Sequence, residues 1–517
     1  MKREILINAS PRETRVAILE DEQLVELMLD RPDTRRMVGD IYLGRVEAVL
    51  PGIQAAFVDI GTEKSAFLHA SDLVYPEDEP RDDDDESEDE DEESEARRGR
   101  KAKAPAIQDA LKRGQDILVQ VSKEPISTKG PRVTAQISLA GRFLVYMPFA
   151  ARVGVSRKIG ERAERHRLRD LVKEVLPDDS GGVIVRTVGE DVTQETFKVE
   201  LGTLMNTWKR IKRKTHFMRA PALVHRETGL TRGLIRDLFS TKVDSLTVDS
   251  KQVFNEITEY LKGIAPDLMD RVKLYEEQTP LFDQHEVEQE IRDLFKRRCD
   301  LPSGGYLIIE QTEALISIDI NSGRYTGKKD PEKTIFKTNT EAAREVARQL
   351  RLRDLGGIIV CDFIDMETKQ NRDKVLQELR SNLSRDRART KAFAVSDLGL
   401  IEMTRQRVRQ SHLQNMTDAC PTCAGTGRVF TPETIVRRME RSVRRMAIEG
   451  KKDNIIVKLH PDVAMYVLEH EQDLMRKMEK AVGFSIELRD DPLLKPDDFK
   501  MVVKGAERDV TGQYAVA

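Results

Sequence analysis

The sequence holds few of the residues that mark secreted or membrane-bound proteins. Four cysteines in 517 residues are too few for a disulfide framework. No apolar run approaches the length of a membrane span. The charged start MKREILINASPRE (1–13) is not followed by the apolar stretch of a secretory signal. These absences argue against a disulfide-rich secreted domain and a membrane-spanning protein, and they predict a cytoplasmic protein.

Aromatic residues are also scarce, at 5%, whereas charged residues make up 34% of the chain. A chain of this length and composition is expected to fold into several domains, each with a modest core. The net charge of −4 is the sum of two oppositely charged parts of the chain. Residues 77–95 hold 15 acidic residues and one basic residue. The remainder carries 85 Lys and Arg against 75 Asp and Glu, a net charge of +10. A basic body predicts a polyanionic partner.

Two short β-branched segments each end on an acidic residue. They are ALISIDINSG (314–323), with Asp319, and GGIIVCDFIDM (356–366), with Asp362. Between them, EAAREVARQLRLRDL (341–355) shows the apolar periodicity of an amphipathic helix. A strand, a helix and a strand predict a crossover between two parallel strands. Both carboxylates would then lie at the C-terminal edge of the sheet, where open α/β sheets bind ligands.

Two carboxylates held close together in water repel each other, and a divalent cation between them removes that repulsion. Asn321, two residues beyond Asp319, adds a neutral oxygen ligand. Magnesium held by one or two carboxylates suits phosphate chemistry. A single aspartate of this kind is more often a strand-end or turn residue. The metal hypothesis therefore depends on Asp319 and Asp362 meeting in space.

Two further segments, 39–73 and 114–141, have a β-rich pattern with regularly placed glycines. They predict a small β-barrel of the oligonucleotide-binding type, interrupted by a low-complexity loop. We expect that loop to be disordered, since it has too little apolar surface to fold. Phe57 and Phe67 on this unit either stack on nucleobases or fill the barrel core, and the residues alone favour neither.

The segment GGVIVRTVG (181–189) places Arg186 and Thr187 at the end of a predicted strand. A guanidinium beside a hydroxyl suits a terminal phosphate. An Arg-Thr pair is nevertheless more often an ordinary surface pair, so this signal is weak by itself.

The segment CPTCAGTG gives Cys420 and Cys423 the spacing of a metal knuckle. Structural zinc takes four ligands, and no local Cys or His pair completes the set. Two chains that each give one CxxC to a shared zinc would satisfy the metal. A redox motif or a pair of free thiols is the alternative. The glycine-rich surroundings favour zinc over a redox motif at a helix start.

In this order, these segments resemble the ribonuclease E/G family, over residues 1–510. Within the family, the chain most resembles the branch whose members lack a long disordered extension. It is carried by the segments ISIDINSG, NTEAAREVARQLRLRDLGGIIVCDFIDM, IEMTRQR, CPTCAGTG and RVGVSRKI ahead of VIVRT. The acidic and then basic insertion at 76–105 departs from the family core, and we expect it to compete with RNA for the basic surface.

The resemblance implies a multidomain fold of mixed α+β and α/β type. The implied parts are a ribonuclease H-like subdomain (1–38 and 231–294), an inserted S1 barrel of the OB-fold type (39–141), a 5′-sensor region (142–230), a DNase I-like catalytic subdomain (295–416), a zinc link (417–430) and a small α+β C-terminal domain (431–510).

The resemblance also implies roles for particular residues. Asp319 and Asp362 would be the catalytic Mg²⁺ ligands, with Asn321 beside them. The other implied roles are a 5′-monophosphate sensor (Arg186, Thr187), S1 contacts to RNA (Phe57, Phe67, Lys123, Lys129), a basic residue near the active site (Arg389), and ligands of a Zn²⁺ shared between two chains (Cys420, Cys423). The shared zinc would hold a homodimer, which pairs further into a tetramer in part of the family.

The activity implied is that of a Mg²⁺-dependent, single-strand-specific endoribonuclease. It would prefer 5′-monophosphorylated RNA, leave 5′-phosphate and 3′-hydroxyl ends, and act in rRNA processing and mRNA decay. A non-catalytic S1-domain factor for RNA binding or ribosome assembly is the alternative, and it leaves the two acidic segments unexplained. A metal-dependent DNase or phosphatase would explain those acids but not the barrel.

Overall fold

The computed structural model divides the chain into two compact units, Met1–His412 and Leu413–Ala517. The described residues are 2–31, 37–73, 106–125, 130–156, 159–178, 180–190, 192–227, 229–240, 242–323, 331–396, 399–407, 410–449 and 453–516. The whole insertion at 76–105 and Lys129 lie outside them. Among the described residues, no helix is long and apolar enough to cross a membrane.

The N-terminal strands share a sheet with strands from the middle of the chain. β1 (Arg3–Ala9), β2 (Thr14–Glu20) and β3 (Gln23–Asp30) form an antiparallel meander, as their alternating apolar runs predict. β14 (Ser245–Val248) and β15 (Val272–Leu274) run parallel to β1, which gives the order β15-β14-β1-β2-β3. The helices α5 (Leu230–Leu238) and α6 (Lys251–Ile264) pack apolar side chains against this sheet.

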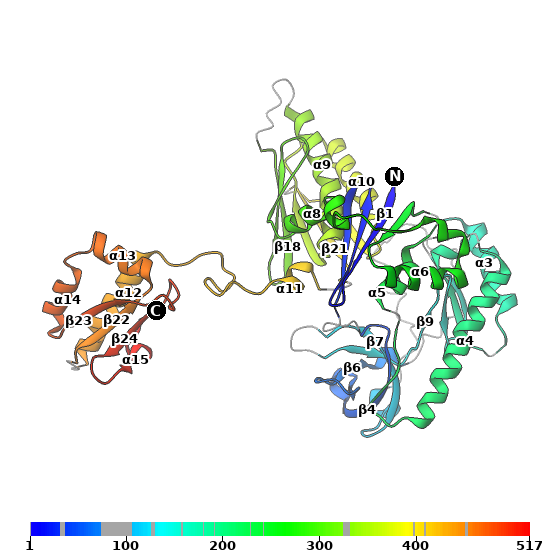
Figure 1. Ribbon diagram of the computed structural model, residues 1–517, viewed down its shortest axis with the longest axis horizontal. Helices are drawn as coiled ribbons and strands as arrows, with labels where there is room; N and C mark the ends of the chain where they lie inside the picture. Colours follow the sequence, from blue (N-terminus) through cyan, green and yellow to red (C-terminus); the bar gives the residue numbers. More distant parts are fainter. Residues whose placement is uncertain are drawn as a thin grey trace. The chain divides into compact units, whose positions relative to one another are not determined.

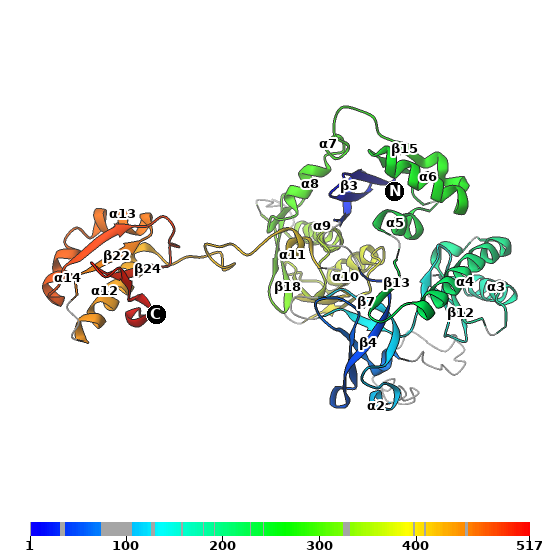
Figure 2. The same ribbon diagram turned by 60° about the horizontal axis from the view of Figure 1, so that its bottom comes forward.

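A small barrel is inserted after β3 and lies in the lower part of Figures 1 and 2. Its strands are β4 (Ile41–Leu50), β5 (Ala55–Asp59), β6 (Ala66–His69), β7 (Asp116–Lys123) and β8 (Arg132–Thr134). They pair in the order β4-β5-β6-β8-β7, and β7 pairs with β4, so the barrel is closed. Fully buried Ala56, Val58, Ala66 and Leu68 help to fill its interior. The five-stranded barrel confirms the coarse prediction for this part of the chain.

A four-stranded sheet follows the barrel, in the order β11-β12-β10-β9. Its strands are β9 (Leu139–Ala140), β10 (Leu144–Met147), β11 (Val153–Val155) and β12 (Gly182–Val185). Figure 2 shows α3 (Arg162–Val175) and α4 (Gln194–Phe217) beside β12. The strand β9 pairs with β10, so the barrel ends at Thr134 rather than near 141. The chain then returns to the barrel, where β13 (Ala222–His225) pairs with β4.

The largest α/β sheet has the order β16-β17-β18-β19-β21-β20. Its strands are β16 (Arg298–Asp300), β17 (Tyr306–Gln311), β18 (Leu315–Asn321), β19 (Gly357–Asp362), β20 (Thr390–Val395) and β21 (Leu400–Arg405). The helix α9 (Pro331–Leu352) joins β18 to β19, and these two strands are parallel neighbours. The predicted strand–helix–strand crossover is therefore confirmed, although the helix begins ten residues earlier than its apolar pattern suggests.

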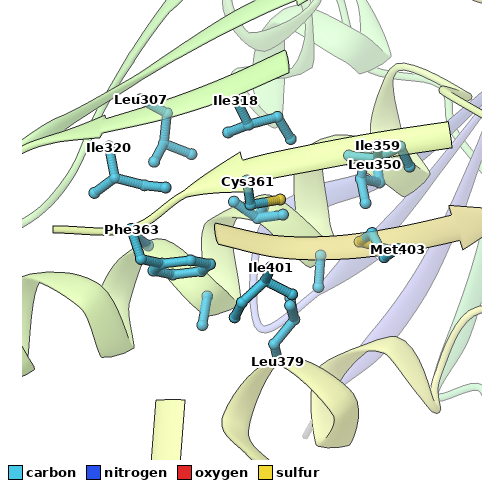
Figure 3. Packing of buried hydrophobic residues seen from close by; sticks show 14 of the residues in the cluster. Leu307, Ile318, Ile320, Leu350, Ile359, Cys361, Phe363, Leu379, Ile401 and Met403 are labelled. Carbon is cyan, nitrogen blue, oxygen red and sulfur yellow. The ribbon is translucent and has the colours of Figure 1, made fainter. Parts of the chain in front are cut away.

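One face of this sheet is covered by α9 and α10 (Lys369–Leu383). Figure 3 shows strand residues Ile318, Ile359 and Cys361 among the same buried side chains as Leu350 of α9 and Leu379 of α10. Each of these five residues is at most 1% exposed. Alternate residues of β18 and β19 point to the opposite face, which carries exposed side chains. The sheet therefore has one packed face and one open face.

The second unit is a small α+β module. Its strands pair in the order β23-β22-β24-β25, with β22 (Ile455–Leu459), β23 (Ile486–Asp490), β24 (Phe499–Val503) and β25 (Arg508–Asp509). The helices α12 (Pro432–Ile448), α13 (Pro461–His470) and α14 (Leu474–Val482) pack on this sheet through buried side chains. The predicted strand–helix–strand pattern of 454–492 is confirmed by the parallel pairing of β22 with β23.

Candidate functional site

Asp319 and Asp362 are direct cross-strand partners on β18 and β19. Residues in register on adjacent strands lie about 4.8 Å apart and point to the same face. Both aspartates are exposed, whereas their neighbours Ile318, Ile320 and Cys361 are at most 5% exposed on the packed face. The two carboxylates therefore share the open face, near the C-terminal edge of the parallel pair.

Asn321 lies two residues beyond Asp319 on the same face of β18. Its side-chain amide Nδ2 donates a 2.8 Å hydrogen bond to Asp319 Oδ2. This bond orients one carboxylate and leaves the amide oxygen of Asn321 beside it. Nowhere in the described part of the chain, this site included, do three His, Cys, Asp or Glu side chains gather as a metal-binding group. The site offers two carboxylates and one amide.

Arg389 is not brought to this pair. It precedes β20, whose first residue Thr390 pairs with Arg405, and Arg405 in turn pairs with Gly357 at the start of β19. Gly357 and Asp362 are five residues apart, which is about 16 Å along a strand. The register therefore places Arg389 at the opposite end of the sheet from the two aspartates.

That opposite end contains a buried ion-pair cluster around Arg405. Its Nε donates to Asp386 Oδ2 at 2.6 Å and its Nη1 donates to the carbonyl oxygen of Leu355 at 2.7 Å. The side chains of Arg405 and Asp386 are 5% and 3% exposed. A Cβ on Gly356 would lie 2.9 Å from Arg407 Cγ, so only glycine allows this close approach. The segments RDLGG and IEMTRQR are thus joined in one structural cluster.

The end of α9 is tied to the N-terminal sheet by a second buried cluster. Arg351 Nη2 lies 3.2 Å from Glu20 Oε1 and 3.1 Å from Glu26 Oε1, and all three side chains are at most 11% exposed. Burial raises the pKa of the Glu26 carboxyl, but Arg387 and Arg351 outweigh it and hold that pKa below its usual range. The arginine-rich segment of α9 therefore joins the two sheets, and it contacts neither aspartate of the open face.

On the barrel, Phe57 and Phe67 are cross-strand partners on β5 and β6. Their rings meet edge to face, with centroids 6.1 Å apart. Both are only half-buried, while the residues that flank them point into the barrel and are fully buried. The two phenylalanines therefore lie on the outer surface, and the alternative that they form the barrel core is excluded for both.

The same row continues across the next two strands. Phe67 pairs with Arg132 of β8, and Arg132 pairs with Lys123 of β7, which is exposed. Arg132 is held by a 2.7 Å ion pair to Asp72. We call the residues Phe57, Phe67, Arg132 and Lys123 the barrel row. Sequence reasoning missed Arg132, because only the strand register reveals that it lies between Phe67 and Lys123.

Arg186 directly follows β12, and its side chain is already engaged. Its Nη1 donates to Asp237 Oδ1 of α5 at 2.6 Å and to the carbonyl oxygen of Gly141 at 2.8 Å. Thr187 is exposed beside it. Burial raises the pKa of Asp237, but Arg236 and Arg186 together hold it below its usual range, so this carboxylate stays charged. The structure keeps Arg186 and Thr187 together and gives the arginine an acidic partner.

A second carboxylate lies close to Arg186. Glu200 of α4 accepts hydrogen bonds from the backbone N–H groups of Arg142, Phe143 and Leu144. Burial raises the pKa of Glu200, in spite of these three bonds. Glu200 fixes the loop whose Gly141 carbonyl accepts from Arg186, so the loop and the arginine are positioned together.

Cys420 and Cys423 lie in the second unit, and both are free thiols. The N–H of Gly427 donates to Cys423 Sγ at 3.3 Å. Hydrogen bonds from Cys423 and Thr422 lower the pKa of the Cys420 thiol, which favours the thiolate that a metal binds. Burial instead raises the pKa of Cys361 to about 12, so that thiol stays protonated.

Comparison with known proteins shows two matches to family models. Residues 138–408 match the model described as Ribonuclease E/G family, and residues 419–505 match the model described as RNase E/G, Thioredoxin-like domain. These matches cover the α/β sheet with both aspartates and the unit that carries Cys420 and Cys423.

Relatives extend the likeness to nearly the whole chain. Ribonuclease G of Haemophilus influenzae is 40% identical over 506 residues, which is 97% of this chain and 99% of that protein. Ribonuclease G of Escherichia coli K12 is 38% identical over 97% of this chain and 100% of its own length. Ribonuclease E of Haemophilus influenzae is 36% identical over 93% of this chain but only 50% of its own length.

The fold, the paired aspartates and these matches define an endoribonuclease, a hydrolase that acts on RNA. More specifically, the chain belongs to the ribonuclease E/G family.

Proposed function

We propose that this endoribonuclease hydrolyses single-stranded RNA with a Mg²⁺ ion held by Asp319 and Asp362. The observation that supports this most strongly is the register pairing of the two aspartates on the open face of the sheet. Two carboxylates about one strand spacing apart fit a small hard cation that keeps several of its waters. When bound, the cation would polarise the phosphodiester and lower the pKa of a bound water.

The residues of the chain supply binding and orientation. Asn321 fixes the Asp319 carboxylate through its amide N–H, and its oxygen is free to accept from water or to face the cation. Hydrolysis by water, rather than attack by the ribose 2′-hydroxyl, leaves 5′-phosphate and 3′-hydroxyl ends. We further propose that the enzyme acts in rRNA processing and mRNA decay in the cytoplasm.

The barrel row supports the proposal that this unit is an S1 domain that aligns the RNA strand. Half-exposed Phe57 and Phe67 present ring surface on which bases stack, and Lys123 and Arg132 lie beside them for the phosphates. Lys129, outside the described residues, and Arg389, at the far end of the α/β sheet, remain proposed RNA contacts that rest on the family resemblance. The ribonuclease H-like and DNase I-like assignments rest on it as well.

Arg186 and Thr187 are proposed to bind the 5′-monophosphate of the RNA. A phosphate that reaches Arg186 meets the carboxylate of Asp237 at the same guanidinium. The negative charge of Asp237 repels a 5′-triphosphate more strongly than a 5′-monophosphate, since the former carries more charge. This gives a physical reason for a preference for monophosphorylated ends.

Cys420 and Cys423 are proposed to share one Zn²⁺ with the same pair of a second chain, which makes a homodimer and, by further pairing, a tetramer. The lowered pKa of Cys420 supports metal binding. Zinc analysis should give about one ion for every two chains, because structural zinc takes four ligands. One zinc per chain, or none in freshly purified protein, would refute the shared link.

The reaction is tested by incubation of the purified protein with 5′-monophosphorylated single-stranded RNA, with Mg²⁺ and with EDTA. We expect cleavage only with the metal, and 5′-phosphate ends on the downstream products. Stable binding without metal-dependent cleavage would instead support the alternative, a non-catalytic S1-domain factor.

A further inference from the structure

A groove of about 380 Å³ opens beside the barrel, where β7, the end of β10 and the helix α4 meet. Phe149 and Trp208 form one wall, with ring centroids 5.4 Å apart and planes at 86°. Phe149 is 60% exposed, although large aromatic side chains are usually covered. The groove thus presents aromatic ring surface to the solvent.

Positive charge lies along the same groove. Lys209 and Lys212 line it together with Trp208, from successive turns of one face of α4. Residues 201–217 hold five Lys and Arg residues and no Asp or Glu. Lys209 and Lys212 are exposed. An aromatic platform bordered by lysines, on the part of α4 from 201 to 217 that lacks acidic residues, is complementary to a polyanion with flat, apolar rings.

The groove is separate from the proposed 5′-phosphate sensor. β10 and β12 pair from Leu144 with Val185 to Met147 with Gly182. Arg186 extends beyond Val185, whereas Phe149 follows Met147 at the other end of the same strand pair. The groove is also within reach of the barrel row, because Leu118 lines it and Lys123 lies five residues further along β7, about 16 Å away.

We propose that this groove binds an unpaired nucleobase of the RNA substrate, as a second stacking site beyond the barrel row. The base stacks on the exposed ring of Phe149 and meets the nearly perpendicular ring of Trp208 edge to face. Lys209 and Lys212 face its flanking phosphates. Stacking of this kind tolerates any base, since every base has a π-face. The proposal rests on RNA being the substrate, and it is independent of the metal and of the 5′-phosphate sensor.

The chain offers a direct reporter, because Trp208 is its single tryptophan. The intact protein is titrated with a single-stranded oligoribonucleotide in buffer without divalent cations, and the RNA is checked on a gel for cleavage. Tryptophan fluorescence is followed beside the anisotropy of the same RNA carrying a label. We expect a saturable change in Trp208 fluorescence with the same midpoint as the anisotropy change.

The matched variants are Phe149→Ala and Phe217→Ala, since Phe217 is 89% exposed near the end of the same helix but does not line the groove. Phe149→Ala should weaken RNA binding at least about fivefold, the smaller effect expected for loss of one base stack. Phe217→Ala should bind as the parent does. Removal of an exposed ring should leave the thermal midpoint unchanged, which separates lost binding from lost folding.

Three results would overturn the proposal. The first is RNA binding by anisotropy with constant Trp208 fluorescence. The second is equal affinity of Phe149→Ala and the parent. The third is a fluorescence change on dilution of the protein alone that RNA does not alter, which would make the groove a contact between copies of this chain. If one of these results is obtained while the protein still cleaves RNA, the groove proposal fails and the proposed reaction stands.

Discussion

Charged side chains lie at both ends of strand β19, but those at its start are buried and those at its end are exposed. At its start, Arg405 is surrounded by Asp386 and the carbonyl of Leu355, and the arginine and the aspartate are almost completely buried. At its end, Asp362 and its neighbour Asp319 are exposed, and among the described residues no ion pair to a basic side chain neutralises them. A buried charge requires a partner to offset desolvation, whereas an exposed pair of like charges keeps its repulsion until a ligand binds. The first arrangement holds the sheet together, and the second leaves a site for a cation.

The same contrast explains why the most distinctive segments of the sequence are not the reactive ones. The arginines of RQLRLRDLGG and of IEMTRQR fix helices and sheets to one another through buried bonds to Glu20, Asp386 and backbone carbonyls. Each acts as scaffold for the register that brings Asp319 to Asp362.

The largest effect on activity should come from changes to the exposed aspartate pair at the end of β19. Asp319→Asn and Asp362→Asn each remove one negative charge from the pair, so we expect RNA cleavage to fall at least about a hundredfold, with RNA binding retained. Glu402→Gln, on the same face of β21, is the matched control and should change the cleavage rate little. Single-turnover cleavage and a filter-binding assay measure the two properties. Near-normal cleavage by both aspartate variants would contradict the assignment of the site.

The buried ion pair of Arg405 and Asp386 at the start of β19 should instead contribute to stability. Arg405→Met leaves Asp386 buried without its cation, so we expect the free energy of unfolding to fall by about 3–5 kcal/mol. Arg444→Met removes an exposed pair with Glu440 and should cost less than about 1 kcal/mol. Denaturant titration measures both. Equal losses of unfolding free energy in the two variants would show that burial does not determine how much these ion pairs contribute to stability.

Acid should weaken the buried cluster around Arg351. The folded-state pKa of Glu26 lies below its unfolded value of 4.5, so the unfolded chain takes up the proton first as the pH falls. The stabilisation is complete above about pH 4.5 and is lost as the pH falls further. Arg351→Met should flatten this acid dependence, because one of the cations that lowers the pKa is gone. An unchanged slope of the free energy of unfolding against pH would refute this explanation.

Arg186 is the intermediate case, an arginine that is paired and also proposed to bind substrate. Arg186→Ala should reduce the preference for 5′-monophosphorylated over 5′-triphosphorylated RNA, by roughly tenfold for a lost charged hydrogen bond. Asp237→Asn should narrow the same preference by admitting the triphosphate. Glu227→Gln removes a carboxylate that pairs with Arg236 and not with Arg186, so it should leave the preference unchanged. Competition between the two RNAs in one reaction gives the ratio directly.

Local patterns in the sequence were sufficient for the elements that carry the site. Alternation of apolar residues predicts β18 and β19, and the helix between them requires parallel strands, which sets Asp319 beside Asp362. The barrel follows similarly from its short strands and glycines. In both, neighbouring positions of the chain determine which face each side chain takes.

Contacts between distant segments could not be predicted in this way. Arg132 joins the barrel row through a register that includes a β-bulge between Val121 and Lys123, and such an extra residue leaves no simple pattern in the sequence. The ion pair of Arg186 with Asp237 spans 51 positions of the chain. Arg389 is the reverse case, because the family resemblance implies a basic residue near the aspartates, whereas the strand register puts Arg389 at the other end of the sheet.

The central claim is that Asp319 and Asp362 together hold one divalent cation. Binding of Mn²⁺, as a spectroscopic substitute for Mg²⁺, can be measured by electron paramagnetic resonance in the parent, in Asp362→Asn and in Glu402→Gln. We predict that Asp362→Asn loses one bound ion per chain, while Glu402→Gln keeps it. Equal Mn²⁺ binding by the parent and Asp362→Asn would contradict the claim.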